Sequence, residues 1–305
     1  EFGQNGSRSL GAYRLSQNIG SLSNLPLDSG IPTSGQIKFS DFYSKKLNIV
    51  VDCHSGGEET RKSAKNDKWN NNNLTVVGGF RSKKEGGSKI IININKKFCS
   101  DKSNVAHCAL KTGSWDATAV VQVDVGSSGS ILGSGGDGGR GQNGIDGSAQ
   151  AGFDGSSGLG IEVNNCTVNV ASGGVVRAGF GGGGGGGGGR QVDKGEDRRA
   201  SGGGGGGGAG CPAGSGGPRG TTGSLGSDGS AGSETTGGGG GNGGNNENQA
   251  FGGSGGSGGQ AQGGPGGGSG GAGANGAAIR RNSGFSVSIN NSGTIAGSTT
   301  GTGVG

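Results

Sequence analysis

The sequence is poor in the side chains that build an apolar core. Phe, Leu, Ile and Val together supply 51 of 305 residues and methionine is absent, which is below the level expected of a packed globular domain. The sequence also does not have the high net charge that keeps many chains disordered, because its formal net charge is only +5. With five prolines the chain cannot form a collagen triple helix.

Targeting and membrane segments are also missing. No run of eighteen apolar residues occurs, so the sequence predicts no membrane-spanning helix, and no signal peptide is visible. The lack of methionine predicts that residue 1 lies inside a longer gene product.

Glycine is abundant and unevenly placed. It supplies 84 residues, of which 13 lie in residues 1–125 and 71 in residues 126–305. Residues 1–125 carry 17 Lys or Arg against 11 acidic residues, a balance of +6, whereas residues 126–305 carry 9 against 10, a balance of −1. A basic head can attract nucleic acid, but a solvated or protein-docking surface is the simpler interpretation. We therefore expect no nucleic-acid partner.

Cysteine usage favours buried, unreactive thiols. The five cysteines at 53, 99, 108, 166 and 211 are an odd set without a CxxC pair, which argues against a disulfide framework or a zinc ribbon. A metal site is one alternative, because both histidines neighbour cysteines, at Cys53-His54 and His107-Cys108. A bridge between Cys99 and Cys108 is another. We expect no metal and no cofactor.

Signatures of catalysis are weak. GxGxxG strings occur within the glycine runs, but none follows a strand and opens a helix, as a dinucleotide site requires. Two histidines without a Ser/His/Asp setting provide no catalytic triad. The sequence therefore predicts no enzyme and no catalytic residues.

Residues 1–47 carry aromatic anchors without enough apolar groups to fold alone. Two related motifs, at 9–14 and 34–43, each place an apolar residue before a polar turn and an aromatic. We expect this segment to dock on a partner protein or on a symmetric copy of the chain, through Leu10, Tyr13, Phe39, Phe42 and Tyr43.

Residues 48–125 predict short β-strands separated by turn-forming residues. Trp69 and Trp115 are the largest core candidates, with an exposed platform for stacking on sugars as the alternative. The pattern predicts a small β-sandwich-like module with strands at 47–51, 74–77, 90–94 and 121–125.

From residue 126 onward glycine recurs with a period of three. It occupies every third position from 214 to 232, and the runs 181–189 and 202–208 are pure glycine. Three is the period of the extended polyproline II helix, which has no internal hydrogen bonds, so its N–H and C=O groups must pair with neighbours. Glycine lets such backbones approach closely. We therefore predict a bundle of extended glycine helices over residues 133–282 in place of an apolar core.

One arch-like pattern occurs three times in this part of the chain. Val125, Val170 and Ile289 are each preceded by an apolar residue at −2 and followed by glycine at +4 and an apolar residue at +6. These segments are expected to form β-arches that pair with one another and hold one end of the glycine helices.

Two polar segments interrupt the glycine helices. Such segments cannot lie inside a bundle bonded through its backbones, so they are expected to be loops at its ends, where binding residues concentrate. Because successive helices reverse direction, we place the two loops at opposite ends. The first segment, 190–201, holds seven charges in twelve residues, and its candidates are Arg190, Gln191, Asp193, Lys194, Glu196, Asp197, Arg198 and Arg199. The second supplies Asn245, Asn246, Glu247, Asn248, Gln249 and Phe251.

Their chemistry suggests binding roles. Arginine suits bidentate contact with acidic sugars or phosphates, and the acidic residues would hold the arginines in place or face basic protein loops. Asparagines suit sugar hydroxyls, and Phe251 offers a stacking face.

Several of these motifs resemble parts of phage tail proteins. Residues 34–43 resemble the SG-x-I-x-FSDFY module near the N-termini of tailed-phage structural proteins, and residues 289–295 (INNSGTI) are similar to a unit of their glycine-rich fibres. Residues 112–139 resemble the start of the glycine-rich part of those fibres. The tail resembles the polyglycine sandwich of T-even-type tail-fibre tip adhesins, while the Cys- and Lys-rich insert at 52–108 departs from it.

The resemblance implies a virion tail-fibre adhesin. Such a protein binds a host outer-surface receptor, a membrane protein or a polysaccharide, through loops between glycine helices, and joins other tail or baseplate proteins. A purely structural fibre or decoration protein is the alternative. The expected fold is all-β with essentially no α-helix, divided into a docking segment at 1–47, a β-module at 48–125 and a polyglycine-II sandwich at 126–305.

Overall fold

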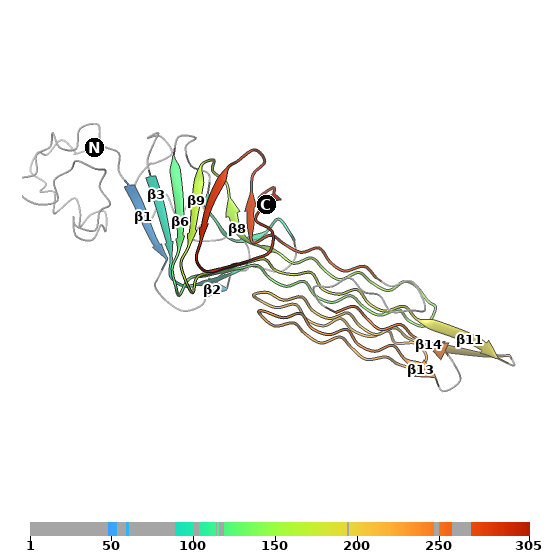
Figure 1. Ribbon diagram of the computed structural model, residues 1–305. Coiled ribbons are helices and arrows are strands. Elements are labelled where there is room, and N and C mark those ends of the chain that lie inside the picture. Colours follow the sequence, from blue (N-terminus) through green and yellow to red (C-terminus); the bar gives the residue numbers. More distant parts are fainter. Residues whose placement is uncertain are drawn as a thin grey trace, which may run out of the picture.

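The molecule has two parts, a block of β-strands and an elongated bundle of extended segments that leaves one end of the block (Figure 1). The computed structural model of the chain describes residues 48–53, 59–60, 89–100, 104–113, 115, 119–193, 195–246, 250–257 and 270–305. No α-helix occurs among these residues, which confirms the expected all-β class. They likewise contain no helix of the length and apolarity that crossing a bilayer requires. The predicted docking residues Leu10, Tyr13, Phe39, Phe42 and Tyr43, as well as Trp69, lie outside the described residues.

The β-strands of the block form three sheets, and every pairing within them is parallel. The first sheet contains β1 (Asn48–Cys53), β3 (Lys89–Ile94), β6 (Val120–Val125), β9 (Cys166–Val170) and β16 (Val287–Asn291) in that order. The second contains β2 (Glu59–Thr60), β4 (Lys97–Cys99), β7 (Ser130–Leu132), β10 (Val175–Arg177) and β17 (Thr294–Ala296). The third contains β5 (Cys108–Lys111), β8 (Ser157–Ile161), β15 (Ile279–Arg281) and β18 (Gly301–Thr302).

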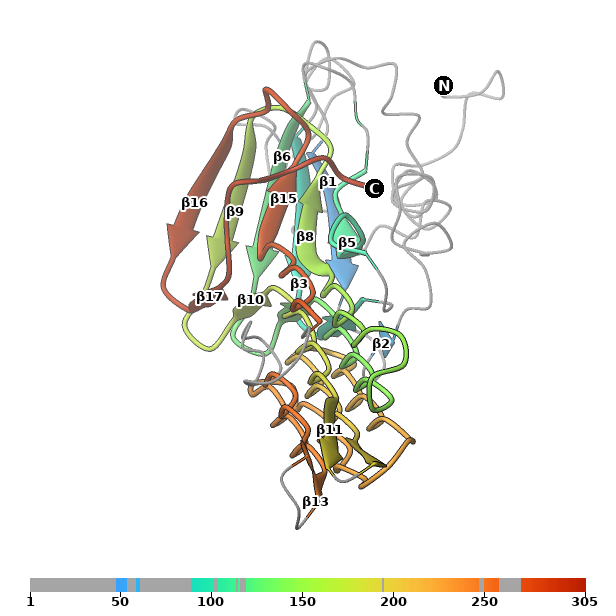
Figure 2. The ribbon, with the colours of Figure 1, turned by 90° about the vertical axis from the view of Figure 1, so that its right-hand side faces the viewer.

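The chain visits the three sheets in a repeating order, which makes the block a parallel β-solenoid. Each turn contributes one strand to each sheet, and Figure 2 shows the strands of successive turns side by side. The complete turns are β3–β4–β5, β6–β7–β8, β9–β10–β15 and β16–β17–β18.

Stacks of apolar side chains fill the solenoid. Alternate residues of each strand point inward, and β-branched residues suit this half-buried surface. Each such side chain contributes about 1.5–3 kcal/mol when fully buried. Trp115 is also buried and donates its indole N–H to the Thr112 carbonyl at 2.8 Å, so the predicted core role of this residue is confirmed. The stacks are Ile92, Val123 and Val168 on the first sheet, Phe98, Ile131 and Val176 on the second, and Leu110, Leu159 and Ile279 on the third.

The three predicted arches are the corners between the first and second sheets. Strands β6, β9 and β16 pair with one another before the corner, and β7, β10 and β17 pair after it. The repeated glycine of each arch packs on the backbone of the preceding turn: a Cβ on Gly129 would lie 2.1 Å from the Ile94 carbonyl oxygen, and one on Gly293 would lie 2.4 Å from that of Ala171. Glycine recurs there because the stacked corners leave no room for a side chain.

We expected a domain boundary at residue 125, between a β-module and the glycine-rich part, but the fold has no boundary there. The solenoid contains strands from both sides of that residue, and the predicted β-sandwich-like module at 48–125 is part of it. In the described part of the chain, the bundle consists of two insertions between the second and third sheets. One follows β7 (133–156), and the other follows β10 (178–193, 195–246, 250–257 and 270–278). Parallel pairing joins strands that lie a whole turn apart, which a local strand pattern does not reveal.

Hydrogen bonds with a period of three join the segments of the bundle, as the glycine spacing predicted. The N–H groups of Gly136, Gly139 and Gln142 donate to the carbonyls of Phe180, Gly183 and Gly186 at 2.9, 2.8 and 3.0 Å. The described extended segments are 133–142, 150–156, 178–188, 201–209, 214–220, 225–232, 237–244, 252–257 and 270–276.

The two pure-glycine runs lie deep in the bundle. Residues 181–188 and 202–208 are buried throughout. Segment 201–209 exchanges backbone hydrogen bonds with the segments 133–142, 178–188, 214–220, 225–232, 237–244 and 252–257. Because neighbouring segments surround this extended segment on all sides, there is no space for a side chain on it.

A disulfide and an ion pair join the bundle to the solenoid. Cys99, at the end of β4, is bonded to Cys211 across 112 residues, and Lys97 pairs with Glu234. The expectation of unreactive thiols is therefore wrong for Cys99 and Cys211, and the alternative bridge from Cys99 to Cys108 does not form. Cys108 and Cys166 are free and buried. The Cys99 partner is not its neighbour in sequence because the bundle returns to the solenoid at residues 210–213.

Candidate functional site

The end of the bundle far from the solenoid gathers the polar segments that interrupt the glycine helices (Figure 1). We call this end the tip. Its described residues are 143–149, 189–193, 195–200, 221–225, 245–246 and 250–251.

The most charged part of the tip is a β-hairpin. Strands β11 (Gly189–Asp193) and β12 (Glu196–Ala200) pair antiparallel, from Gly189 opposite Ala200 to Asp193 opposite Glu196. Gly195 has a φ of 84°, which glycine adopts without strain in a tight hairpin turn. The hairpin begins where the pure-glycine run ends, because a segment with a side chain at every position does not fit inside the bundle.

The arginines of the hairpin are paired with its own acidic residues. Arg190 Nε lies 2.7 Å from Asp197 Oδ1, and Arg199 Nη2 lies 3.0 Å from Asp197 Oδ2. Arg198 pairs with Glu196 at 2.6 Å. These hydrogen bonds, first from Arg190 and then from Arg199, lower the pKa of Asp197. Each pair is exposed and therefore weak by itself, but together they fix the side chains across the hairpin.

Arg199 also connects the hairpin to a second loop. Its Nη1 lies 3.0 Å from Asp146 Oδ2 in the loop 143–149, and its carbonyl accepts the Ser224 N–H at 2.9 Å. The pKa of Arg199 is raised, first by its hydrogen bond with Asp197. This residue thus holds three tip segments in one arrangement.

The two polar interruptions lie at the same end of the bundle, so their prediction at opposite ends is wrong. Strands β13 (Asn245–Asn246) and β14 (Ala250–Phe251) form a second hairpin beside β11 and β12 (Figure 1). A Cβ on Gly189 would lie 2.1 Å from the Phe251 carbonyl oxygen. The chain returns to the tip because it runs back and forth twice in between, through the segments 201–209, 214–220, 225–232 and 237–244.

Apolar side chains protrude between the charged ones. Val192 in β11 and Phe251 in β14 are 58% and 57% exposed, and Leu225 is 52% exposed. Ile145 is 39% exposed in the loop that carries Asp146. Sequence reasoning missed Ile145, Asp146 and Leu225, because the period-three glycine register runs through both of their segments without a break.

One glycine of the sequence register belongs to the tip. Gly223 lies on the period-three register from 214 to 232, but its φ is 82° and it forms the turn at 221–224, so it is not part of a helix. The register continues through this turn, so glycine spacing alone does not mark where one helix ends and the next begins.

The structure places part of the predicted site. Arg190, Gln191, Glu196, Asp197, Arg198, Arg199, Asn245 and Phe251 lie together in the tip with described side chains. Asp193 and Asn246 are placed there by their backbones alone, and Lys194, Glu247, Asn248 and Gln249 lie outside the described residues. Within the described ranges no group of three or more His, Cys, Asp or Glu side chains is arranged to hold a metal ion. The chemistry that the tip offers is that of binding: ion pairs, amides and protruding apolar groups.

Two comparisons with known proteins found a match for this chain. Residues 58–300 match the model of a family described as phage tail fibre adhesin Gp38. Among solved structures, the gp37-gp38 adhesin tip complex of the long tail fibre of bacteriophage S16 matches with 19% identity and a TM-score of 0.43, over 97% of this chain and 95% of that chain. A search of curated proteins found no match.

Proposed function

The chain belongs to the phage tail fibre adhesin Gp38 family, and on this premise we propose that its tip is the surface that binds the host receptor. A tail fibre adhesin is located in the virion tail and attaches the particle to the host cell. We assign that contact to the tip and to particular residues within it.

The proposal rests on the convergence at the tip of the two longest polar interruptions, which form the hairpins β11–β12 and β13–β14, with the loops 143–149 and 221–225 beside them. A bundle bonded through its backbones is a stiff support, and loops on such a support lose little conformational entropy on binding. The other end of the bundle is occupied by its disulfide and ion pair with the solenoid. The tip is therefore the end that is available to a receptor.

Within the tip we assign two roles. The arginines hold the loops, since Arg190, Arg198 and Arg199 are engaged with acidic residues of the tip. Contact is made by the protruding side chains, chiefly Val192 and Phe251, because desolvated apolar anchors with a polar rim dominate binding energy in protein interfaces. This assignment favours a close-packed contact over the arginine-to-anion contact that the sequence suggested.

For attachment to the particle we propose residues 1–47. The five anchors Leu10, Tyr13, Phe39, Phe42 and Tyr43 would pack against another tail protein or a second copy of this chain. Replacing all five by Ala should remove the chain from assembled particles, as detected by protein gels of purified virions. Normal incorporation would refute this assignment.

The receptor assignment is tested by adsorption of particles to host cells. Replacing residues 191–200 by a short Gly/Ser turn should slow adsorption strongly, because it removes the hairpin while leaving the glycine register intact. A matched pair of single changes sharpens the test. Phe251 and Phe153 are 57% and 59% exposed, but Phe153 lies on the side of the bundle in segment 150–156. Phe251→Ala should reduce adsorption and Phe153→Ala should not; equal adsorption by both variants would contradict the proposal.

A further inference from the structure

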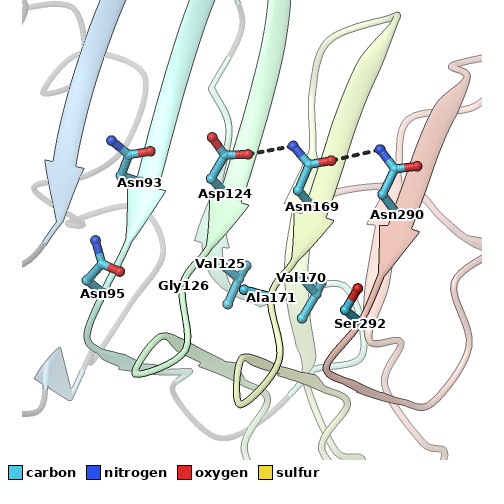
Figure 3. Close-up of a pocket in the computed structure, with 10 residues that line it drawn as sticks. All are labelled: Asn93, Asn95, Asp124, Val125, Gly126, Asn169, Val170, Ala171, Asn290 and Ser292. Carbon is cyan, nitrogen blue, oxygen red and sulfur yellow. Dashed lines mark hydrogen bonds between the residues drawn. The ribbon is translucent and has the colours of Figure 1, made fainter.

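A row of amide and carboxylate side chains crosses the outer face of the first sheet of the solenoid. Asn93 in β3, Asp124 in β6, Asn169 in β9 and Asn290 in β16 occupy the same register position on successive strands. Figure 3 shows the four side chains in line across the strands. Asn169 Nδ2 donates to Asp124 Oδ1 at 2.6 Å, and Asn290 Nδ2 donates to Asn169 Oδ1 at 2.8 Å.

The row borders a shallow cavity of about 370 Å³. Asn95 and Ser292 lie below Asn93 and Asn290 in the view of Figure 3, and Val125 and Val170 also line the cavity. Space for the Asn95 amide depends on Gly126, since a Cβ there would lie 2.0 Å from Asn95 Oδ1. The cavity is therefore shaped by specific residues of four successive turns.

The hydrogen-bonded series from Asn290 through Asn169 to Asp124, which we call the ladder, holds these side chains in place but does not use all their donors and acceptors. An asparagine carries two N–H donors and an oxygen that accepts two bonds, and the ladder uses one donor each of Asn169 and Asn290. The Asp124 carboxylate accepts from Asn169 and also from Gln122 at 2.9 and 2.8 Å. The remaining donors and acceptors of Asn169 and Asn290 are held in place before any ligand binds.

The chemistry of the lining selects the ligand class. The residues that line the cavity, all within the described part of the chain, include no Lys, Arg or His to attract an anion. The single carboxylate is already occupied by amide donors, and no aromatic or long apolar side chain is present for a hydrophobic ligand. The donors and acceptors that Asn169 and Asn290 retain beyond the bonds between them and Asp124 match sugar hydroxyls, which also donate and accept.

We propose that this row is a binding site for a neutral polysaccharide that lies across the strands. The strands repeat every ~4.8 Å across a parallel sheet, which is comparable to the length of one sugar residue in an extended glycan. Several weak contacts, one for each turn of the solenoid, would hold the glycan. The site is distant from the tip (Figure 1) and does not depend on the receptor assignment made for it. A glycan held on the solenoid would raise the effective concentration of the tip near the cell surface.

The test is a binding titration with the purified full chain. The probes are the neutral surface polysaccharide of a strain that the particle infects and dextran as an unrelated neutral glycan. Asn169→Ala and Asn290→Ala should each weaken binding of the surface polysaccharide about tenfold or more, the loss expected when a hydrogen-bonding partner is removed from a site. Ser288→Ala is the matched control, because Ser288 lies exposed two residues before Asn290 on β16 and outside the cavity. Its affinity should remain that of the wild type.

A second variant separates binding from the stability of the ladder. Ala171→Trp should fill the cavity without removing a ladder residue and should abolish polysaccharide binding with an unchanged unfolding midpoint. The chain in which a Gly/Ser turn replaces residues 191–200 should bind the polysaccharide like the wild type. The proposal is overturned if the wild type does not bind the neutral surface polysaccharide, or if it binds only charged polymers. It is also overturned if the Asn290→Ala and Ser288→Ala variants bind the polysaccharide equally well. Loss of binding with the hairpin replacement would place the glycan at the tip instead.

Discussion

The replacement of Gly205 by alanine tests whether the bundle owes its stability to close backbone contact. Gly205 lies in the middle of segment 201–209, where its N–H donates to the Gly139 carbonyl at 2.8 Å and its own carbonyl accepts the Gly217 N–H at 2.7 Å. A Cβ on Gly205 would lie 2.0 Å from the Gly183 carbonyl oxygen, whereas ordinary contact begins at 3.4 Å. The added methyl group must therefore push segments 178–188 and 201–209 apart by more than 1 Å.

The cost of this displacement can be estimated from the bonds that join the two segments. Gly183 N–H donates to Gly206 and Gly186 N–H donates to Gly203, both at 2.8 Å, and each buried bond is worth about 1 kcal/mol. Overpacking of a dense interior adds about 1–3 kcal/mol. We therefore expect Gly205→Ala to lower the free energy of unfolding by about 3–5 kcal/mol.

The same substitution at Gly271 is expected to change the free energy of unfolding in the opposite direction. It lies in the outer segment 270–276, and no atom lies within 4 Å of a Cβ built on it. Gly271→Ala should stabilise the chain by about 0.4–1 kcal/mol, because alanine restricts the unfolded chain more than glycine does. Denaturant unfolding of both variants measures the free energies, and hydrogen exchange of residues 178–188 locates the damage. A Gly205→Ala variant as stable as the wild type would refute the close-packed glycine bundle.

Three further predictions concern single features of the fold. Replacing Cys99 and Cys211 by Ser should lower the free energy of unfolding by about 2–5 kcal/mol and make it insensitive to reductant; a wild type that is equally insensitive would contradict this. Because the folded pKa of Asp197 is lowered, its contribution to hairpin stability is present above the ordinary pKa of about 3.9 and lost as the pH falls through the lower folded value. Asp197→Asn should remove that pH dependence from hydrogen exchange in the hairpin, and its persistence would count against the assigned pairing. Burial raises the pKa values of Cys108 and Cys166 to about 12, so neither thiol should be alkylated at pH 8 until the chain unfolds, as peptide mass spectrometry would show.

The glycine helices and the arches were predictable from the sequence because both are written as short repeats. The register from 214 to 232 carries the period of the helix, and the arches at Val125, Val170 and Ile289 repeat the same apolar and glycine positions. In both the helices and the arches, glycine recurs at a fixed spacing because two backbones approach closely at those positions.

Features that depend on distant pairing were not predictable. Nothing local in sequence indicates that Cys99 meets Cys211, or that Val121 of β6 pairs with Cys166 of β9. The location of the two hairpins at one end depends on how many helices separate them, and short reversals such as residues 210–213 hide that number. The arginines were identified as site residues, but their pairing with Asp197 and Asp146 depends on the hairpin register and on a neighbouring loop.

Footprinting of the purified chain on host envelope that carries the receptor would show whether the tip is the receptor-binding surface. Hydroxyl radicals label exposed side chains, and Val192, Leu225, Phe251 and Phe153 are all more than half exposed in the free chain. Binding should protect Val192, Leu225 and Phe251, which belong to the tip, and leave Phe153 on the side of the bundle labelled as before. Protection of Phe153 with continued labelling of the three tip residues would show that the receptor binds elsewhere and would contradict the account.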